Sequence, residues 1–109
     1  MIEVRTYIDG KGRRPFAKWL DGTSGAAHAK VQAAIARMEL GDLSNARPVG
    51  AGVSEYRIAF GPGYRIYFGQ DGDALIMLLG GGTKQRQQRD IEAAKALWQE
   101  YRQRKRQAG

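Results

Sequence analysis

A chain of 109 residues, 42% of them hydrophobic, has room for one hydrophobic core, so we expect a single domain spanning residues 1–109. The absence of cysteine excludes disulfide bonds and thiolate zinc sites, and it favours the cytoplasm as the compartment. A formal net charge of +7 indicates an anionic partner, either nucleic acid or an acidic protein. No apolar run approaches the roughly 20 residues of a membrane-spanning helix, so we expect no membrane partner.

The first half of the chain is predicted to form a strand, two helices and a loop. Residues 2–8 alternate apolar and polar side chains, as strands do. A short helix is expected over 15–22, with a proline at its first position and a glycine at its end. A second helix, capped by Thr23 or Ser24 and stopped by Gly41, has an alanine-rich apolar stripe. The following segment, 41–52, is rich in Gly, Asn and Pro and is predicted to be a loop.

A hairpin is predicted around the sequence Gly-Pro-Gly at 61–63. If these three residues are the whole loop, Phe60 lies opposite Tyr64. Successive residues of a strand point to opposite faces, so one apolar face is predicted to hold Tyr56, Ile58, Phe60, Tyr64, Ile66 and Phe68. Arg57 and Arg65 then emerge together on the other face, as diagonal neighbours.

A second hairpin and a long helix complete the predicted fold. The sequence Asp-Gly at 71–72 indicates a two-residue turn, which pairs Phe68 with Leu75 and places Leu75, Met77 and Leu79 on the apolar face. The three glycines at 80–82 are predicted to be a flexible connection, and a helix with an apolar face begins near Asp90. The expected fold is α+β, with an N-terminal strand, two helices, an antiparallel sheet of about four strands and a C-terminal helix.

Cations are predicted to converge at the end of the first hairpin. Because the third strand ends near Gly80, beside Arg65, the basic loop that follows can fold back over the arginines. Several cations around one point stabilise a phosphate whose charge grows during displacement. The alternative is that both arginines are ordinary surface residues, with Glu55 as an ion-pair partner for Arg57. The predicted catalytic residues are Arg57, Arg65, Lys84 and Arg86.

The C-terminal quarter carries most of the charge. Residues 83–109 hold eight Lys or Arg against three Asp or Glu, a net charge of +5. Cations at a helix C-terminus either stay solvated and complement the helix dipole or contact RNA. The predicted RNA contacts are Arg47, Tyr67, Arg89, Arg102 and Lys105. The single histidine, His28, is predicted to be a packing or surface residue, and the scattered acids predict no metal site.

Two segments resemble a known family. VSEYRIAFGPGYRIYF at 53–68 and LIMLLGGGTKQRQQRDIEAAKALW at 75–98 are similar to the RelE/ParE toxin superfamily of bacterial toxin–antitoxin modules, in the HigB-like branch often labelled addiction-module killer proteins. FAKWLDG extends the resemblance over nearly the whole chain. It implies a RelE-like fold and a toxin neutralised by a cognate antitoxin, for which a helix-turn-helix protein is one candidate. On the RelE side it implies an endoribonuclease that cuts mRNA on the ribosome through attack of the 2′-hydroxyl on the adjacent phosphate, without metal or cofactor.

The resemblance also assigns roles to particular positions. Arg57 matches a functional lysine of RelE-type enzymes, and Arg65 matches a functional arginine. Ala59 stands where RelE has a second lysine, and Ile91 falls at or near its last active-site tyrosine. Lys84 or Arg86 could supply the remaining cation. Arginine stays protonated, so the general base is expected to be either Lys84 with a lowered pKa or a group of ribosomal RNA. These departures leave two alternatives, a ParE-like gyrase poison without nuclease activity and a general RNA-binding module.

Overall fold

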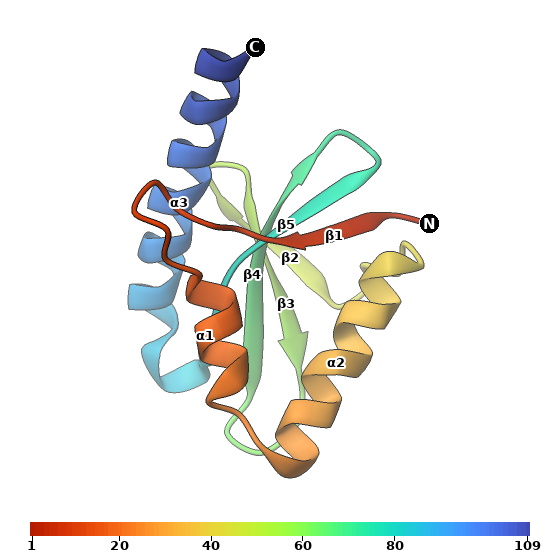
Figure 1. The fold of residues 1–109 in the computed structure, drawn as a ribbon. Helices are drawn as coiled ribbons and strands as arrows, with labels where there is room; N and C mark the ends of the chain where they lie inside the picture. The colour runs from red at the N-terminus through yellow and green to blue at the C-terminus, as the bar shows by residue number, and fades with distance from the viewer.

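A mixed sheet of five strands, in the order β1-β5-β4-β3-β2, forms the middle of the computed structural model, which describes residues 1–109 (Figure 1). The strands are β1 (Glu3–Thr6), β2 (Ala46–Gly50), β3 (Val53–Ile58), β4 (Tyr64–Asp71) and β5 (Leu75–Thr83). The helices are α1 (Pro15–Asp21), α2 (Gly25–Glu39) and α3 (Gln87–Ala108), with a short 3-10 turn η1 (Lys84–Arg86) before α3. β1 runs parallel to β5, and the other neighbours are antiparallel. The α+β class and the C-terminal helix are therefore confirmed.

Helices cover both faces of the sheet. Figure 1 shows α1 and α2 in front of the strands and α3 along their other side. One apolar cluster joins α1 and α2 to the sheet through Phe16, Val31, Ala34, Met38, Tyr56, Ile66, Phe68, Ile76 and Leu78. A second cluster joins α3 to the opposite face through Tyr7, Val53, Tyr67, Met77, Leu79, Ile91, Ala94 and Trp98. Because both faces are packed, the central strands β4 and β5 are buried along most of their length.

The three helices lie close to where the sequence predicts them. α1 begins at Pro15 and is followed by Gly22, as expected. Ser24 is the residue before α2, whose apolar stripe buries Val31, Ala34 and Met38. α3 begins at residue 87, three residues before the predicted start. None of the three combines the length and the hydropathy needed to cross a membrane.

The predicted loop at 41–52 contains a strand, and this prediction is wrong. Residues 46–50 form β2, which pairs antiparallel with β3 and brings the sheet from about four strands to five. Pro48 has no N–H to donate, but β2 is an edge strand with a free side, where proline is tolerated. The register shifts between Pro48 and Gly50, after which Gly50 pairs with Val53.

The first hairpin has a longer loop than predicted. Ile58 pairs with Tyr64, and Arg57 lies directly opposite Arg65, so the predicted pairing of Phe60 with Tyr64 is wrong by two residues. The strands separate after residue 58 because the Gly63 N–H bonds to the Phe60 carbonyl at 3.0 Å and closes a tight turn instead. A shift of two residues preserves the faces of the strand. The prediction that both arginines share one face is therefore confirmed, but as a direct pair.

The second hairpin turns through three residues, and its predicted register is wrong. Asp71 pairs with Leu75, and a bulge further along separates the Phe68–Leu78 pair from the pair of residues 67 and 80. The odd shift exchanges the faces of β5. Ile76 and Leu78 pack against α1 and α2, whereas Met77 and Leu79 pack against α3.

The three glycines predicted as a flexible connection belong to β5. Side chains from the two helical layers lie directly against two of them, Gly81 and Gly82. A Cβ on Gly81 would come within 2.2 Å of Trp19 Cε3, and a Cβ on Gly82 within 2.0 Å of Asp90 Oδ2. These glycines serve close packing on both sides of the sheet.

Candidate functional site

Two arginines contact one buried carboxylate, and a third lies across the strand from it, on the face of the sheet that α3 partly covers. Arg47 lies opposite Glu55, and Arg57 lies opposite Arg65. We call these four residues the arginine face. Only 1% of the Glu55 side chain and 8% of the Arg65 side chain are exposed, compared with 43% for Arg57. Arg57 is therefore the more accessible of the two predicted catalytic arginines.

One oxygen of Glu55, Oε1, lies beside the Nε atom of both Arg57 and Arg65. Arg57 donates its Nε–H to Glu55 Oε1 at 3.1 Å, and Arg65 Nε lies 3.5 Å from the same oxygen. Gln87, the first residue of α3, donates its side-chain amide to Oε1 at 3.0 Å and to Oε2 at 2.8 Å. The Nε–H of Arg65 is buried and has no hydrogen-bond partner, so Arg65 and Glu55 form an ion pair without a hydrogen bond. Arg57 is the guanidinium whose outer nitrogens remain to bind an anion. The ion pair between Glu55 and Arg57, which belonged to the alternative of ordinary surface arginines, is present.

The end of the first hairpin brings Lys84 close to Arg65. The Gly63 carbonyl accepts the backbone N–H of Lys84 at 3.0 Å and Nη1 of Arg65 at 3.5 Å. A Cβ on Gly63 would lie 3.2 Å from Arg65 Nη1 and 3.7 Å from Lys84 Cβ. β5 stays paired with β4 as far as Thr83, so Lys84 reaches the end of the hairpin as a continuation of the strand. The prediction that the strand ends near Gly80 and that a basic loop folds back over the arginines is therefore wrong. Arg86, in the same 3-10 turn, is exposed.

Tyr67 is buried, which contradicts its predicted role as an RNA contact. Its side chain packs in the apolar cluster beneath α3, and its hydroxyl has no hydrogen-bond partner. Burial, together with the negative charges of Glu55 and Asp90, raises the pKa of Tyr67 to about 12. The sequence could not show this, because the covering residues come from α3.

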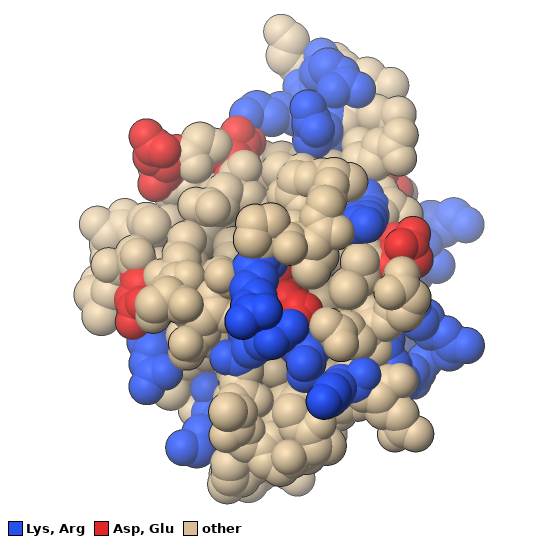
Figure 2. Space-filling view, turned by 180° about the vertical axis from the view of Figure 1, so that it is seen from behind, with Lys and Arg blue, Asp and Glu red and all other residues tan.

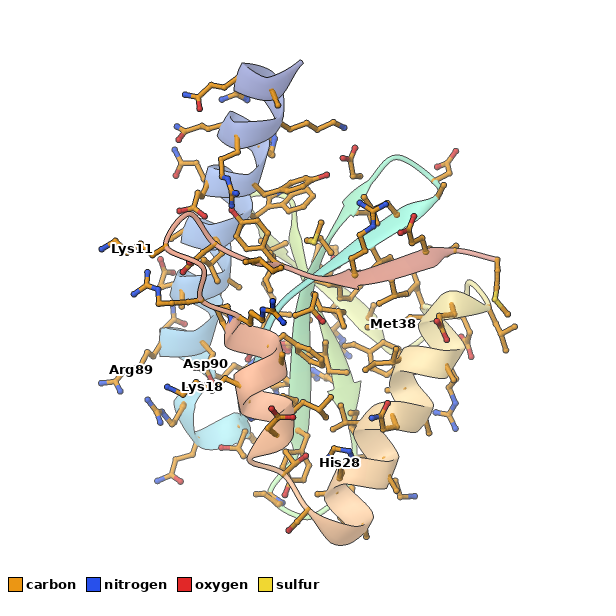
Figure 3. All side chains as sticks on the ribbon, viewed as in Figure 1. Lys11, Lys18, His28, Met38, Arg89 and Asp90 are labelled. Carbon is orange, nitrogen blue, oxygen red and sulfur yellow. The ribbon has the colours of Figure 1, made fainter.

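Asp90 is a second carboxylate near this face that the sequence did not indicate. It lies over Gly82, and Gly82 is the cross-strand partner of Arg65. Burial raises the pKa of Asp90, and the charges of Arg86 and Arg89 oppose that rise. Figure 3 shows Arg89 pointing away from the molecule, whereas Asp90 lies on the side of α3 nearer α1. Gly82 is the sequence signal that could have indicated this contact, because a glycine within a strand often marks the close approach of another group.

The predicted RNA contacts in the second half of α3 lie far from the arginine face. Arg102 and Lys105 follow Gln87 by four to five helical turns, which corresponds to roughly 22–27 Å along the helix axis. Lys105 Nζ pairs with Asp71 Oδ2 at 2.6 Å, and Arg102 borders open grooves beside Trp98. On the side turned away from α1 and α2, Lys and Arg side chains gather across the middle of the surface, with few acids among them (Figure 2).

The single histidine has a local role. His28 lies in the first turn of α2, half-buried, with Nδ1 at 3.0 Å from Thr23 Oγ1 and Nε2 at 3.4 Å from the Gln32 amide. This agrees with the predicted packing or surface role. No group of three or more His, Cys, Asp or Glu side chains comes together in a way that could hold a metal ion.

Comparison with known proteins connects the chain to one relative. No protein-family model matches it. The chain is 40% identical over 100 residues to an uncharacterized protein of Haemophilus influenzae (strain ATCC 51907 / DSM 11121 / KW20 / Rd), and the alignment covers 91% of this chain and 95% of that protein. The chain therefore belongs to the same family as this Haemophilus influenzae protein.

Proposed function

We propose that the chain is the toxin of a type II toxin–antitoxin module, with a RelE-like fold, and that it cleaves mRNA on the ribosome. The observation that carries the proposal is the direct pairing of Arg57 with Arg65 across two strands, with Lys84 held at the same end of the hairpin. The positive charges of Arg57, Arg65 and Lys84 outnumber the one negative charge of Glu55, so this end of the hairpin can neutralise a phosphodiester, and a guanidinium can hold two of its oxygens at once.

The proposed reaction needs no group beyond RNA and side chains. The 2′-oxygen forms a bond to phosphorus as the bond to the 5′-oxygen breaks, leaving a 2′,3′-cyclic phosphate and a 5′-hydroxyl. Arg57 binds the phosphate from the solvent side, and the buried guanidinium of Arg65 adds its charge behind it as negative charge develops on the phosphate. The proton of the 2′-hydroxyl passes to a general base, for which Lys84 and ribosomal RNA are the proposed groups, and the departing 5′-oxygen takes up a proton from water to become the 5′-hydroxyl.

The partners in this proposal are the ribosome with its mRNA and an antitoxin, and the compartment is the cytoplasm. The net charge of +7 suits an RNA-rich target and also an acidic antitoxin. Arg57 and the cations of α3 are the exposed surfaces that an antitoxin would cover. Arg86, Arg89 and Arg102 are the exposed cations proposed to contact RNA outside the reacting centre.

Replacing Arg57 tests the proposal more sharply than replacing Arg65. Arg65 is buried beside Glu55, so its reversal to Glu would place two carboxylates together and disturb the fold. We expect Arg57→Gln to slow cleavage of a translated mRNA about 100-fold or more, the effect of removing one preorganised charge donor. Primer extension on that mRNA measures the cleavage. Arg37→Gln, which removes an exposed cation on α2, is the control and should cleave normally. Normal cleavage by a folded Arg57→Gln protein would contradict the proposal.

A second candidate function is a ParE-like gyrase poison. The observation that favours it is the burial of Glu55 between the arginines, since this carboxylate offsets part of the positive charge that a nuclease would aim at phosphate. A supercoiling assay with purified gyrase, run beside the primer extension, separates the two functions. Inhibition of supercoiling without mRNA cleavage would establish the second.

A further inference from the structure

A ladder of aromatic rings leads from the core to the tip of the β3–β4 hairpin. The ring centroids of Phe16 and Trp19 lie 5.7 Å apart, those of Trp19 and Tyr64 lie 6.4 Å apart, and those of Tyr64 and Phe60 lie 6.4 Å apart. Lys30 Nζ lies 5.6 Å from the centre of the outermost ring, Phe60. Phe16 is buried, but the other three rings are half-buried and retain exposed surface.

An open cavity lies between the middle rings of this ladder. Trp19 and Tyr64 form two of its walls, and small residues, including Gly22 and Ala27, form much of the rest. Its volume is about 690 Å³, within the usual range for small-ligand sites. The Trp19 ring lies directly on the backbone of β5, where a Cβ on Gly81 would come within 2.2 Å of it. This wall is therefore fixed in place before any ligand arrives.

Unpaired cations flank the cavity. Lys18 borders it, Lys30 covers the end of the ring ladder, and Lys84 lies on the other side of the hairpin tip. None of the three forms an ion pair within the chain. Free cations beside exposed rings suit a ligand that combines negative charge with flat aromatic surface.

The hairpin tip separates this cavity from the arginine face by only a few residues. A Cβ on Gly61 would lie 3.7 Å from the Tyr64 ring, whereas a Cβ on Gly63 would lie 3.2 Å from Arg65 Nη1. Tyr64 and Arg65 are consecutive in β4 and therefore point to opposite faces of the sheet. A linear ligand that crosses the hairpin tip can place a phosphate on the arginine face and its next chemical group in the cavity on the other face.

We propose that this cavity binds an unpaired nucleobase of a single-stranded RNA whose backbone crosses the hairpin tip to the arginine face. The inference rests on the proposed function for its choice of RNA. Proteins recognise unpaired bases by stacking them on aromatic side chains while cations follow the backbone. Trp19 and Tyr64 supply the aromatic surface, and Lys18 and Lys84 supply the charge on either side of the tip. An apolar side chain of a partner protein would leave these lysines without a counter-charge.

Binding of a fluorescent short oligoadenylate to the full chain tests this site. An abasic oligomer with the same sugar–phosphate backbone is the companion probe. We expect wild-type protein to bind the oligoadenylate at least about five-fold more tightly than the abasic oligomer, the lower limit of what one base–aromatic stack contributes. Ala27→Leu, which fills the cavity from α2, should remove most of that difference. Ala33→Leu makes the same change at an exposed position of the same helix and should leave it intact.

The binding experiment tests the cavity independently of whether the protein cleaves mRNA. Base-dependent binding that Ala27→Leu abolishes would support the site even if primer extension detected no mRNA cleavage. Equal affinity of wild-type protein for the two oligomers would overturn it, even if mRNA were cleaved. An Ala27→Leu protein that melts like wild type and still discriminates fully between the oligomers would also overturn it.

Discussion

Glu55 connects three separate parts of the molecule through one carboxylate. It binds Arg57 on its own strand, Arg65 on the next strand and Gln87 at the start of α3. The hydrogen bonds fix the orientation of Arg57 and Gln87, whereas Arg65 is held beside the carboxylate by charge. We infer that Glu55 positions both guanidiniums for an anion.

Removing the charge of Glu55 should be costly to the fold. Glu55→Gln leaves the buried guanidinium of Arg65 without its counter-ion, and breaking a buried pair in this way typically costs about 3 kcal/mol or more. We expect a loss of that order in the free energy of unfolding measured by urea denaturation. Glu3→Gln breaks an ion pair whose two side chains are more than half exposed, and it should cost less than about 1 kcal/mol. Similar losses for the two variants would argue against the assigned role of Glu55.

Among the elements, β5 carries the tightest contacts between layers, and its three glycines provide an internal comparison. A Cβ on Gly81 would overlap Trp19, whereas a Cβ on Gly80 has no atom within 4 Å. We expect Gly81→Ala to lower the free energy of unfolding by about 1–3 kcal/mol, as overpacking does. Gly80→Ala should be neutral or raise it by up to about 1 kcal/mol, because alanine restricts the unfolded chain. Urea denaturation of both variants gives the comparison, and equal effects would contradict the packing argument.

The elements also show which features the sequence could predict. Local signals placed α1, because Pro15 and Gly22 mark helix ends, and period-two alternation placed Arg57 and Arg65 on one face. The register of both hairpins was wrong because loop length depends on where pairing stops, and no local motif fixes that point. β2 was missed because Pro48 favours a loop unless the strand lies at an edge, which only the assembled sheet reveals.

The sequence predicted which cations of the candidate site lie together, but it did not predict how deeply they are buried. The sequence indicated Arg57, Arg65 and Lys84, and the structure brings the three to one end of a hairpin. It did not indicate that Arg65 and Tyr67 are buried, since their cover depends on how α3 packs across the sheet. Burial of a polar residue is a tertiary property, and alternation along a strand distinguishes only the two faces.

Across the whole molecule, positive charge is distributed along α3 as well as at the arginine face. Arg102 is exposed and forms no ion pair, so its charge is available to a polyanion. If RNA follows this helix, Arg102→Gln should reduce the slope of log affinity against log salt concentration by about 0.7, the contribution of one phosphate contact on a single strand. Titrations of a short oligoadenylate at several salt concentrations measure the slope. Arg5→Gln removes a cation that is already paired with Glu3 and should leave the slope unchanged. An unchanged slope for Arg102→Gln would remove this residue from the RNA path.

The parallel pairing of β1 with β5 has a consequence for synthesis of the chain. Glu3 pairs with Leu75 and Thr6 with Leu78, so the N-terminal strand has no partner until the last third of the polypeptide has been made. Pairing over so long a stretch of chain is slow to form and closes late. Until β5 has left the ribosome exit tunnel, the nascent chain therefore lacks the strand that joins β1 to the rest of the sheet, and with it part of the surface on which α3 packs.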